Sequence, residues 1–230
     1  MKFFFQWMAL LCASAALAQP VSTASLPSFF QQSIPAELSG GLQLVEVKAR
    51  CERCEPWRDL GFYSLNAPVR TERVTVLDGY RAMYAFPGTH YFANVKIERS
   101  EVAKYEADRD VMDRALRHEC QRKQTNVENY LAENLAARDK FEPRRMPGRP
   151  YVEVESGIRD GLAYLACTEN VIGLISSTIS QVQIFVPAKR LTITAYLLKQ
   201  EKMHFKSIEE FRALRDGFLS SYIDFLNKSP

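Results

Sequence analysis

The sequence predicts an α+β fold in a single domain, built from a mainly antiparallel sheet, a long central helix and a C-terminal amphipathic helix packed on that sheet. Short segments with the two-residue alternation of half-buried strands occur both before and after a long segment with helical spacing. A second helical segment closes the chain and carries one apolar stripe that a sheet would bury. Runs of strands separated by single helices, without strict alternation of the two, are typical of the α+β class.

The strands predicted before the long helix are short runs rich in β-branched and aromatic residues. They cover residues 42–48, 61–65, 72–77, 81–86 and 90–98. In the last of these runs one face is apolar and the other mostly polar, which is typical of a half-buried antiparallel strand. Asp78 and Gly79 lie between two runs, and this dipeptide predicts a hairpin turn there.

The central helix is predicted from about residue 100 to residue 140, with Ser100 as its N-cap. Its apolar residues recur at steps of three and four. The polar stretch at residues 121–126 interrupts this pattern, and Thr125 with Glu128 would form a second capping box. One long helix with an exposed middle is favoured, and two consecutive helices are the alternative.

Residues 139–150 contain three prolines and a glycine, and this composition predicts a loop. Four further strands are predicted after it, at residues 151–155, 161–167, 171–186 and 191–198. The last helix begins after Ser207, with Glu210 completing a capping box. Its apolar stripe consists of Ile208, Phe211, Leu214, Phe218, Leu219, Tyr222, Phe225 and Leu226. The polar face mixes acids with bases, which favours docking on the protein's own core over a membrane surface.

Residues 1–18 have the layout of a secretory signal peptide, in which a single lysine precedes an apolar segment and small residues precede the cleavage site. Residues 19–40, rich in Ser, Pro and Gln, are expected to be a loosely held lead-in that Phe29 and Phe30 attach to the body, and residues 41–230 to form the single domain. We therefore expect an exported protein, periplasmic in a bacterium and otherwise secreted. No transmembrane segment is predicted after cleavage.

Four cysteines follow the signal peptide, namely Cys51, Cys54, Cys120 and Cys167. An even number in an exported chain predicts disulfides. The preferred pairing is Cys51–Cys54 with Cys120–Cys167, and the alternative joins the 51–54 loop to either distant cysteine. Cys51 and Cys54 also have the spacing of a redox dithiol. The residues after them indicate a turn and a strand, whereas a helix would be needed to lower the pKa of the first thiol.

Other chemistry is weakly supported by the sequence. Cys51, Cys54, His118 and Cys120 are of zinc-ligand type, but residues two apart on a helix point in different directions, so no metal site is predicted. Serine-hydrolase and phosphate-binding motifs are not found, and no cofactor is predicted. A formal net charge of +3 gives no basis for nucleic-acid binding.

The remaining surface signal is a group of three arginines in the proline-rich loop, Arg144, Arg145 and Arg149. Guanidinium groups match carboxylates and phosphates, so these residues are candidates for binding an acidic partner, and a solvated linker is the alternative. We expect a non-enzymatic binding or interaction protein of the cell envelope, such as an accessory, immunity or inhibitor protein, whose partner is another protein or a small envelope ligand. A thiol–disulfide oxidoreductase that uses Cys51 and Cys54 is the alternative.

Overall fold

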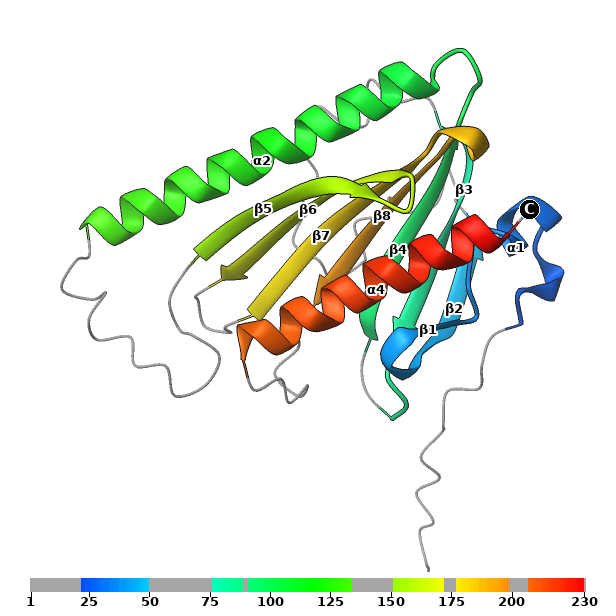
Figure 1. Ribbon diagram of the computed structural model, residues 1–230, viewed down its shortest axis with the longest axis horizontal. Helices are drawn as coiled ribbons and strands as arrows, with labels where there is room; N and C mark the ends of the chain where they lie inside the picture. The colour runs from blue at the N-terminus through cyan, green and yellow to red at the C-terminus, as the bar shows by residue number, and fades with distance from the viewer. Residues whose placement is uncertain are drawn as a thin grey trace, which may run out of the picture.

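The computed structural model describes residues 22–49, 76–88, 91–133, 151–171, 177–198 and 207–229. These residues form an eight-stranded antiparallel sheet with a long helix against each face (Figure 1). The strands are β1 (Glu37–Leu38), β2 (Leu42–Ala49), β3 (Val76–Ala85), β4 (Tyr91–Ser100), β5 (Tyr151–Arg159), β6 (Leu162–Val171), β7 (Ser177–Val186) and β8 (Leu191–Leu198). The α-helices are α1 (Ser28–Gln31), α2 (Tyr105–Glu133) and α4 (Ile208–Lys228). The predicted α+β fold is confirmed.

The sheet consists of two antiparallel meanders that meet at the β4–β8 pair. The strand order is β1-β2-β3-β4-β8-β7-β6-β5, so the first four strands make one half and the last four make the other. Helix α2 lies between β4 and β5 in the chain. It connects the centre of the sheet, where β4 lies, to the edge formed by β5. As a result β5 is an edge strand, although it begins the second meander.

Helix α4 packs on one face of the sheet, called here the α4 face, and this face is mostly apolar. The register places Ala82, Val95, Ala195, Val182 and Ala166 side by side across five strands, and all of them are buried. The helix contributes Phe211, Phe218, Leu219 and Tyr222 to the same core. The Ser207 hydroxyl accepts a hydrogen bond from the Glu210 amide at 3.2 Å, which confirms the predicted N-cap.

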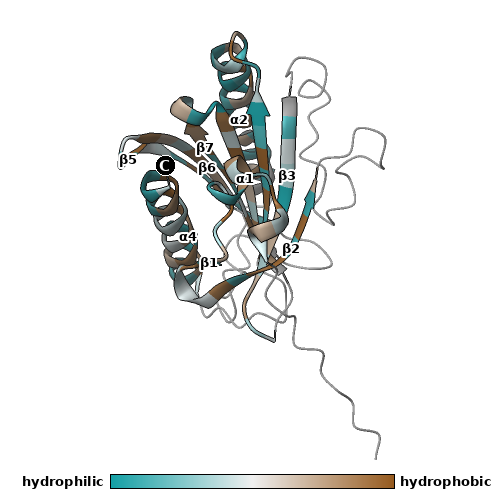
Figure 2. Ribbon diagram, turned by 90° about the vertical axis from the view of Figure 1, so that its right-hand side faces the viewer, coloured by the Kyte–Doolittle hydropathy of each residue, from teal (hydrophilic) through white to brown (hydrophobic). Residues whose placement is uncertain are grey.

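Helix α2 lies on the opposite face, called here the α2 face (Figure 2). It is a single continuous helix, as favoured over two shorter ones. Its buried stripe has a spacing of three and four residues and consists of Tyr105, Asp108, Met112, Leu116 and Cys120. The Tyr105 hydroxyl donates to the Leu191 carbonyl of β8 at 3.2 Å, and Cys120 is bonded to Cys167 of β6. The helix therefore crosses the sheet obliquely, from β8 toward the β5 edge.

Two local predictions at the ends of β3 and β4 are wrong. Asp78 and Gly79 do not form a turn, because β3 runs through them and pairs with β4 on both sides of them. A Cβ at Gly79 would lie 2.8 Å from the Ile97 carbonyl oxygen, so the glycine allows β4 to approach closely. Ser100 is not an N-cap, because it ends β4 and donates its amide to the Arg190 carbonyl at 3.1 Å.

The N-terminal segment is more tightly packed than the sequence indicates. Phe30 is buried in the main core, in line with its expected attachment to the body, but Ile34 and Leu38 of the expected loose segment are buried there as well. The hydroxyl of Tyr84 donates to the Pro35 carbonyl at 2.9 Å, and that of Tyr222 donates to the Ser33 carbonyl at 2.8 Å. Burial raises the pKa of both tyrosines, so these donors stay protonated in the physiological pH range.

Several predictions lie outside the described residues, namely the signal peptide at residues 1–18, the start of the lead-in, the strand at residues 61–65, most of the strand at residues 72–77 and the loop at residues 139–150. Among the helices that the structure describes, none combines the length and the apolarity needed to span a bilayer.

Candidate functional site

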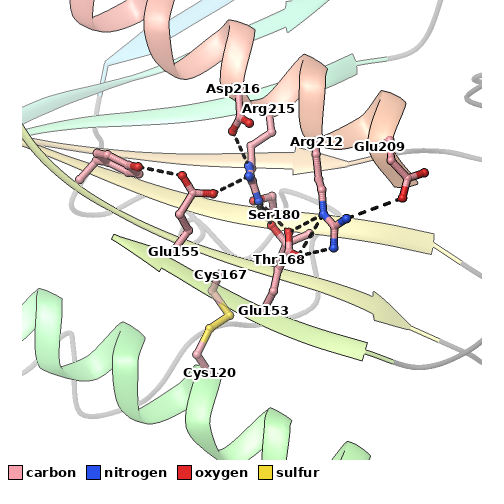
Figure 3. A network of polar contacts seen from close by, with 11 residues as sticks. Cys120, Glu153, Glu155, Cys167, Thr168, Ser180, Glu209, Arg212, Arg215 and Asp216 are labelled. Atoms are coloured by element: carbon pink, nitrogen blue, oxygen red, sulfur yellow. Dashed lines mark hydrogen bonds and ion pairs between the residues drawn. A yellow bond between two sulfur atoms is a disulfide. The ribbon is translucent and has the colours of Figure 1, made fainter. Parts of the chain in front are cut away.

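The cysteines and arginines singled out in the sequence have different outcomes. Cys120 and Cys167 form a disulfide between α2 and β6, which is one half of the preferred pairing (Figure 3). Cys51 and Cys54 lie outside the described residues, as does the arginine group. The arginine group consists of Arg144, Arg145 and Arg149. The redox and recognition hypotheses on these five residues therefore stay predictions.

The metal hypothesis loses one of its four candidate ligands. Cys120 is occupied by its disulfide, while His118 lies two residues earlier on α2 and is exposed to solvent. Within the described ranges, no group of three or more His, Cys, Asp or Glu side chains has a metal-binding arrangement. His118 is exposed and Cys120 is buried, so these two side chains, two residues apart on α2, point in different directions.

A cluster of charged side chains joins α4 to β5, the edge strand (Figure 3). Arg215 is its centre and is only 4% exposed. Its Nε donates to Asp216 at 2.9 Å, its Nη1 to Glu153 and to Thr168 at 2.9 Å each, and its Nη2 to Glu155 at 2.7 Å. Every guanidinium nitrogen of Arg215 thus has an oxygen partner.

Arg212 extends this cluster by one helical turn. It forms a forked pair with Glu153, with its Nε at 3.0 Å and its Nη2 at 2.6 Å from Oε2. The hydrogen bond with Glu153 raises the pKa of Arg212. Burial alone would lower the pKa of Arg215, but its hydrogen bond with Asp216 and the nearby carboxylates outweigh this and raise that pKa. Both arginines stay charged, and the saturated contacts indicate a structural role in docking α4.

The α2 face of the sheet differs from the α4 face because polar side chains occupy its centre. The register runs from Cys167 to Gln181, from Gln181 to Tyr196 and from Tyr196 to Asn94, so these residues share one face. The neighbouring rows on this face add Arg81, Lys96, Glu98, Gln183, Thr192 and Thr194. For residues 90–98 the sequence predicts that the polar face is exposed to solvent. Asn94, on that face, is completely buried.

Several side chains of this region have buried polar atoms that lack a hydrogen-bond partner in the described part of the chain, among them Nε of Arg81 in a neighbouring row. Both amide atoms of Asn94, both amide atoms of Gln183, the hydroxyl of Thr192 and Oδ2 of Asp108 make no hydrogen bond with any described residue. We call these four residues the polar cluster, because three of them share the α2 face of the sheet and the fourth belongs to the buried stripe of α2. They come from β4, β7, β8 and α2. A buried polar group left unpaired costs about 1–3 kcal/mol, so the polar cluster is an energetic burden on the fold.

The polar cluster is the best candidate for a functional site in the described part of the chain. Amides offer two donors and two acceptors each, and the Asp108 carboxylate adds an acceptor. Such a set is suited to holding a polar ligand or ordered water in a place shielded from solvent. The sequence signal was present as alternating polar residues in three strands, but only the register shows that the three share a face.

The two buried threonines Thr192 and Thr168 provide a matched test of this interpretation. Both are at most 1% exposed, but Thr168 accepts from Arg215 and shares a 2.9 Å hydrogen bond with Ser180, whereas the Thr192 hydroxyl is unpaired. We expect Thr168→Val to lower the free energy of unfolding by about 1.5–3 kcal/mol. Thr192→Val is expected to leave it unchanged or to raise it. Chemical denaturation of both variants measures this, and an equal loss in both would contradict it.

Comparison with known proteins gave no matching family model, no matching curated protein and no matching solved structure.

Proposed function

We propose that this chain is an exported, non-enzymatic binding protein of the cell envelope, and that the polar cluster holds a small neutral ligand rich in hydroxyl or amide groups. The observation that carries the proposal is the burial of Asn94, Gln183, Thr192 and Asp108 without described partners. Proteins place unpaired polar groups inside the fold at a cost in stability, and binding sites are where that cost is retained.

The chemistry of the polar cluster favours a neutral ligand over a charged one. Two of its members are amides and one is a hydroxyl, and the single carboxylate can accept from a hydroxyl or an N–H group. Arg81 of the neighbouring row has an ion pair with Glu46 at 3.5 Å through its Nη2, while its buried Nε has no described hydrogen-bond partner. A strongly anionic ligand would meet the negative charge of the Asp108 carboxylate, which disfavours its burial there.

Export is supported by the signal-like residues 1–18 and is compatible with the Cys120–Cys167 disulfide, because disulfides persist in oxidising compartments. The alternative function, a thiol–disulfide oxidoreductase using Cys51 and Cys54, is separated by the reduction potential of that pair. A potential near those of periplasmic oxidants would favour the enzyme, and a much lower one would favour a structural bridge.

Ligand binding is tested with the protein isolated from its native envelope under non-denaturing conditions. We expect its native mass to exceed the mass of the polypeptide by that of a bound small molecule. We also expect N-acetylglucosamine, which carries both hydroxyl and amide groups, to raise the thermal midpoint of the protein after its own ligand is removed. The double variant Asn94→Leu/Gln183→Leu is expected to lose both effects, because it removes four of the unpaired polar atoms.

Gln124→Leu is the matched control, since it removes an exposed amide of α2 outside the polar cluster. It is expected to keep both the added mass and the response to N-acetylglucosamine. A wild-type protein that carries no added mass and does not respond to N-acetylglucosamine would contradict the proposal and leave ordered water as the occupant of the polar cluster.

A further inference from the structure

The outer edge of β5 is the one long strand edge of the sheet that no described strand pairs with. β5 ends the sheet order, and no described strand pairs with its outer side. It has nine residues and no proline, whereas the strand at the other end of the order, β1, has only two. Long open edges are places where another strand adds by backbone hydrogen bonding, and proteins usually block them.

The side chains of β5 strengthen this observation. Among the described residues, the exposed large hydrophobic side chains are Val102, Val154 and Ile158, and two of these three belong to β5. Val154 is 43% exposed and Ile158 is 78% exposed. Both lie on the α2 face, because Val154 is opposite Cys167 and Ile158 follows it at an even spacing. The oblique path of α2 leaves Ile158 uncovered.

We propose that two copies of the chain associate through antiparallel pairing of their β5 strands, with the two-fold axis at Ser156. In this register Val154 lies opposite the partner's Ile158, so the two exposed hydrophobic residues cover each other. On the α4 face, Glu153 lies opposite the partner's Arg159. Both matches occur twice because of the symmetry, which is the property of an isologous interface.

The charges near β5 are complementary across this axis. Arg159 donates to the Asp216 carbonyl at 3.2 Å and to the Ser220 hydroxyl at 2.6 Å, and it has no carboxylate partner among the described residues. The cluster around Arg212 and Arg215 contains more acids than bases, namely Glu153, Glu155, Glu209 and Asp216 against two arginines. The partner's Arg159 would therefore meet an excess of negative charge.

Neighbouring symmetric registers lack this match. An axis at Glu155 would place that carboxylate opposite its own copy, and like charges directly opposite are destabilising. An axis at Gly157 would place Val154 opposite the partner's Asp160 and Ile158 opposite the partner's Ser156, which separates the hydrophobic pair. Only the axis at Ser156 joins both the hydrophobic and the charged partners of this strand.

The first experiment measures the mass of the protein in solution by sedimentation. We expect a dimer at about 100 μM, a concentration far above the dissociation constant of a micromolar complex. Ile158→Lys is expected to weaken the association at least about tenfold, because it places an ammonium group against the partner's Val154. Val102→Lys is the matched control, since Val102 is 75% exposed but lies outside β5, and it is expected to leave the dimer intact.

The second experiment tests the register by mild oxidation of cysteine variants. Ser156→Cys is expected to cross-link two copies, because directly opposite residues have Cβ atoms about 4.5–5.5 Å apart. Ile158→Cys is expected not to cross-link, because the two copies of this residue are offset by four positions, or roughly 13 Å. A monomeric wild type, a dimer insensitive to Ile158→Lys, or cross-linking of Ile158→Cys in place of Ser156→Cys would each overturn the proposal.

Discussion

Replacing Arg215 by Met is expected to lower the free energy of unfolding by about 3–5 kcal/mol, which is a large share of the stability of a typical domain. The guanidinium is almost completely buried and bonds to Glu153, Glu155 and Asp216. Methionine fills much of the same space but leaves these three carboxylates without their central cation. The decrease in the free energy of unfolding arises mainly from the carboxylates left without a compensating charge, and less from the missing ion-pair attraction itself.

Arg122→Met is the control for this prediction. Arg122 also bonds a carboxylate, that of Glu119 at 2.6 Å, but its side chain is more than half exposed on α2. Exposed pairs of this kind contribute about 0–1 kcal/mol. Urea denaturation of the two variants should therefore give clearly different midpoints. Similar small losses in both would mean that Arg215 is not the electrostatic anchor of α4.

The sequence contained a signal for Arg215 that an apolar-stripe analysis passes over. The residue lies between Phe211 and Phe218 at the spacing of the buried face, so its position alone predicts burial. Glu153 and Glu155 alternate on one face of a predicted strand, which places both carboxylates on the same side. What the sequence does not contain is the pairing of this strand with that helix, because it joins segments about sixty positions apart.

The polar cluster could not be predicted for the same reason, because its residues come from separate strands and a helix whose pairing the sequence does not show. The strand and helix pattern was largely predictable because alternation, helical spacing and caps are local signals, as at Ser207. Local signals failed at Gly79, where an Asp-Gly pair typical of turns serves the close approach of β4. They also failed for Asn94, whose polar neighbours predicted a solvent-facing side chain. Both failures depend on which strand lies alongside, and this is decided by tertiary structure.

Removal of the Cys120–Cys167 disulfide is expected to have the second large effect. The bond joins residues 47 positions apart in the sequence, and closing a loop of this length stabilises a protein by about 2–4 kcal/mol, chiefly by restricting the unfolded chain. The double variant Cys120→Ala/Cys167→Ala should be less stable than the oxidised wild type by this amount. Reductant should destabilise the wild type by more than it destabilises the double variant, and any effect left in the variant belongs to Cys51 and Cys54.

The disulfide also holds α2 against the sheet, so its loss should be visible locally. The described contacts that fix the helix to the strands include the Tyr105 hydrogen bond near its start, the disulfide, and an ion pair between Lys123 and Glu169. Without the disulfide, hydrogen exchange of the α2 amides should increase more than that of α4. Because Asp108 belongs to the polar cluster and lies on α2, ligand binding should weaken as well. A double variant with unchanged unfolding free energy and unchanged α2 exchange would show that packing alone fixes this helix.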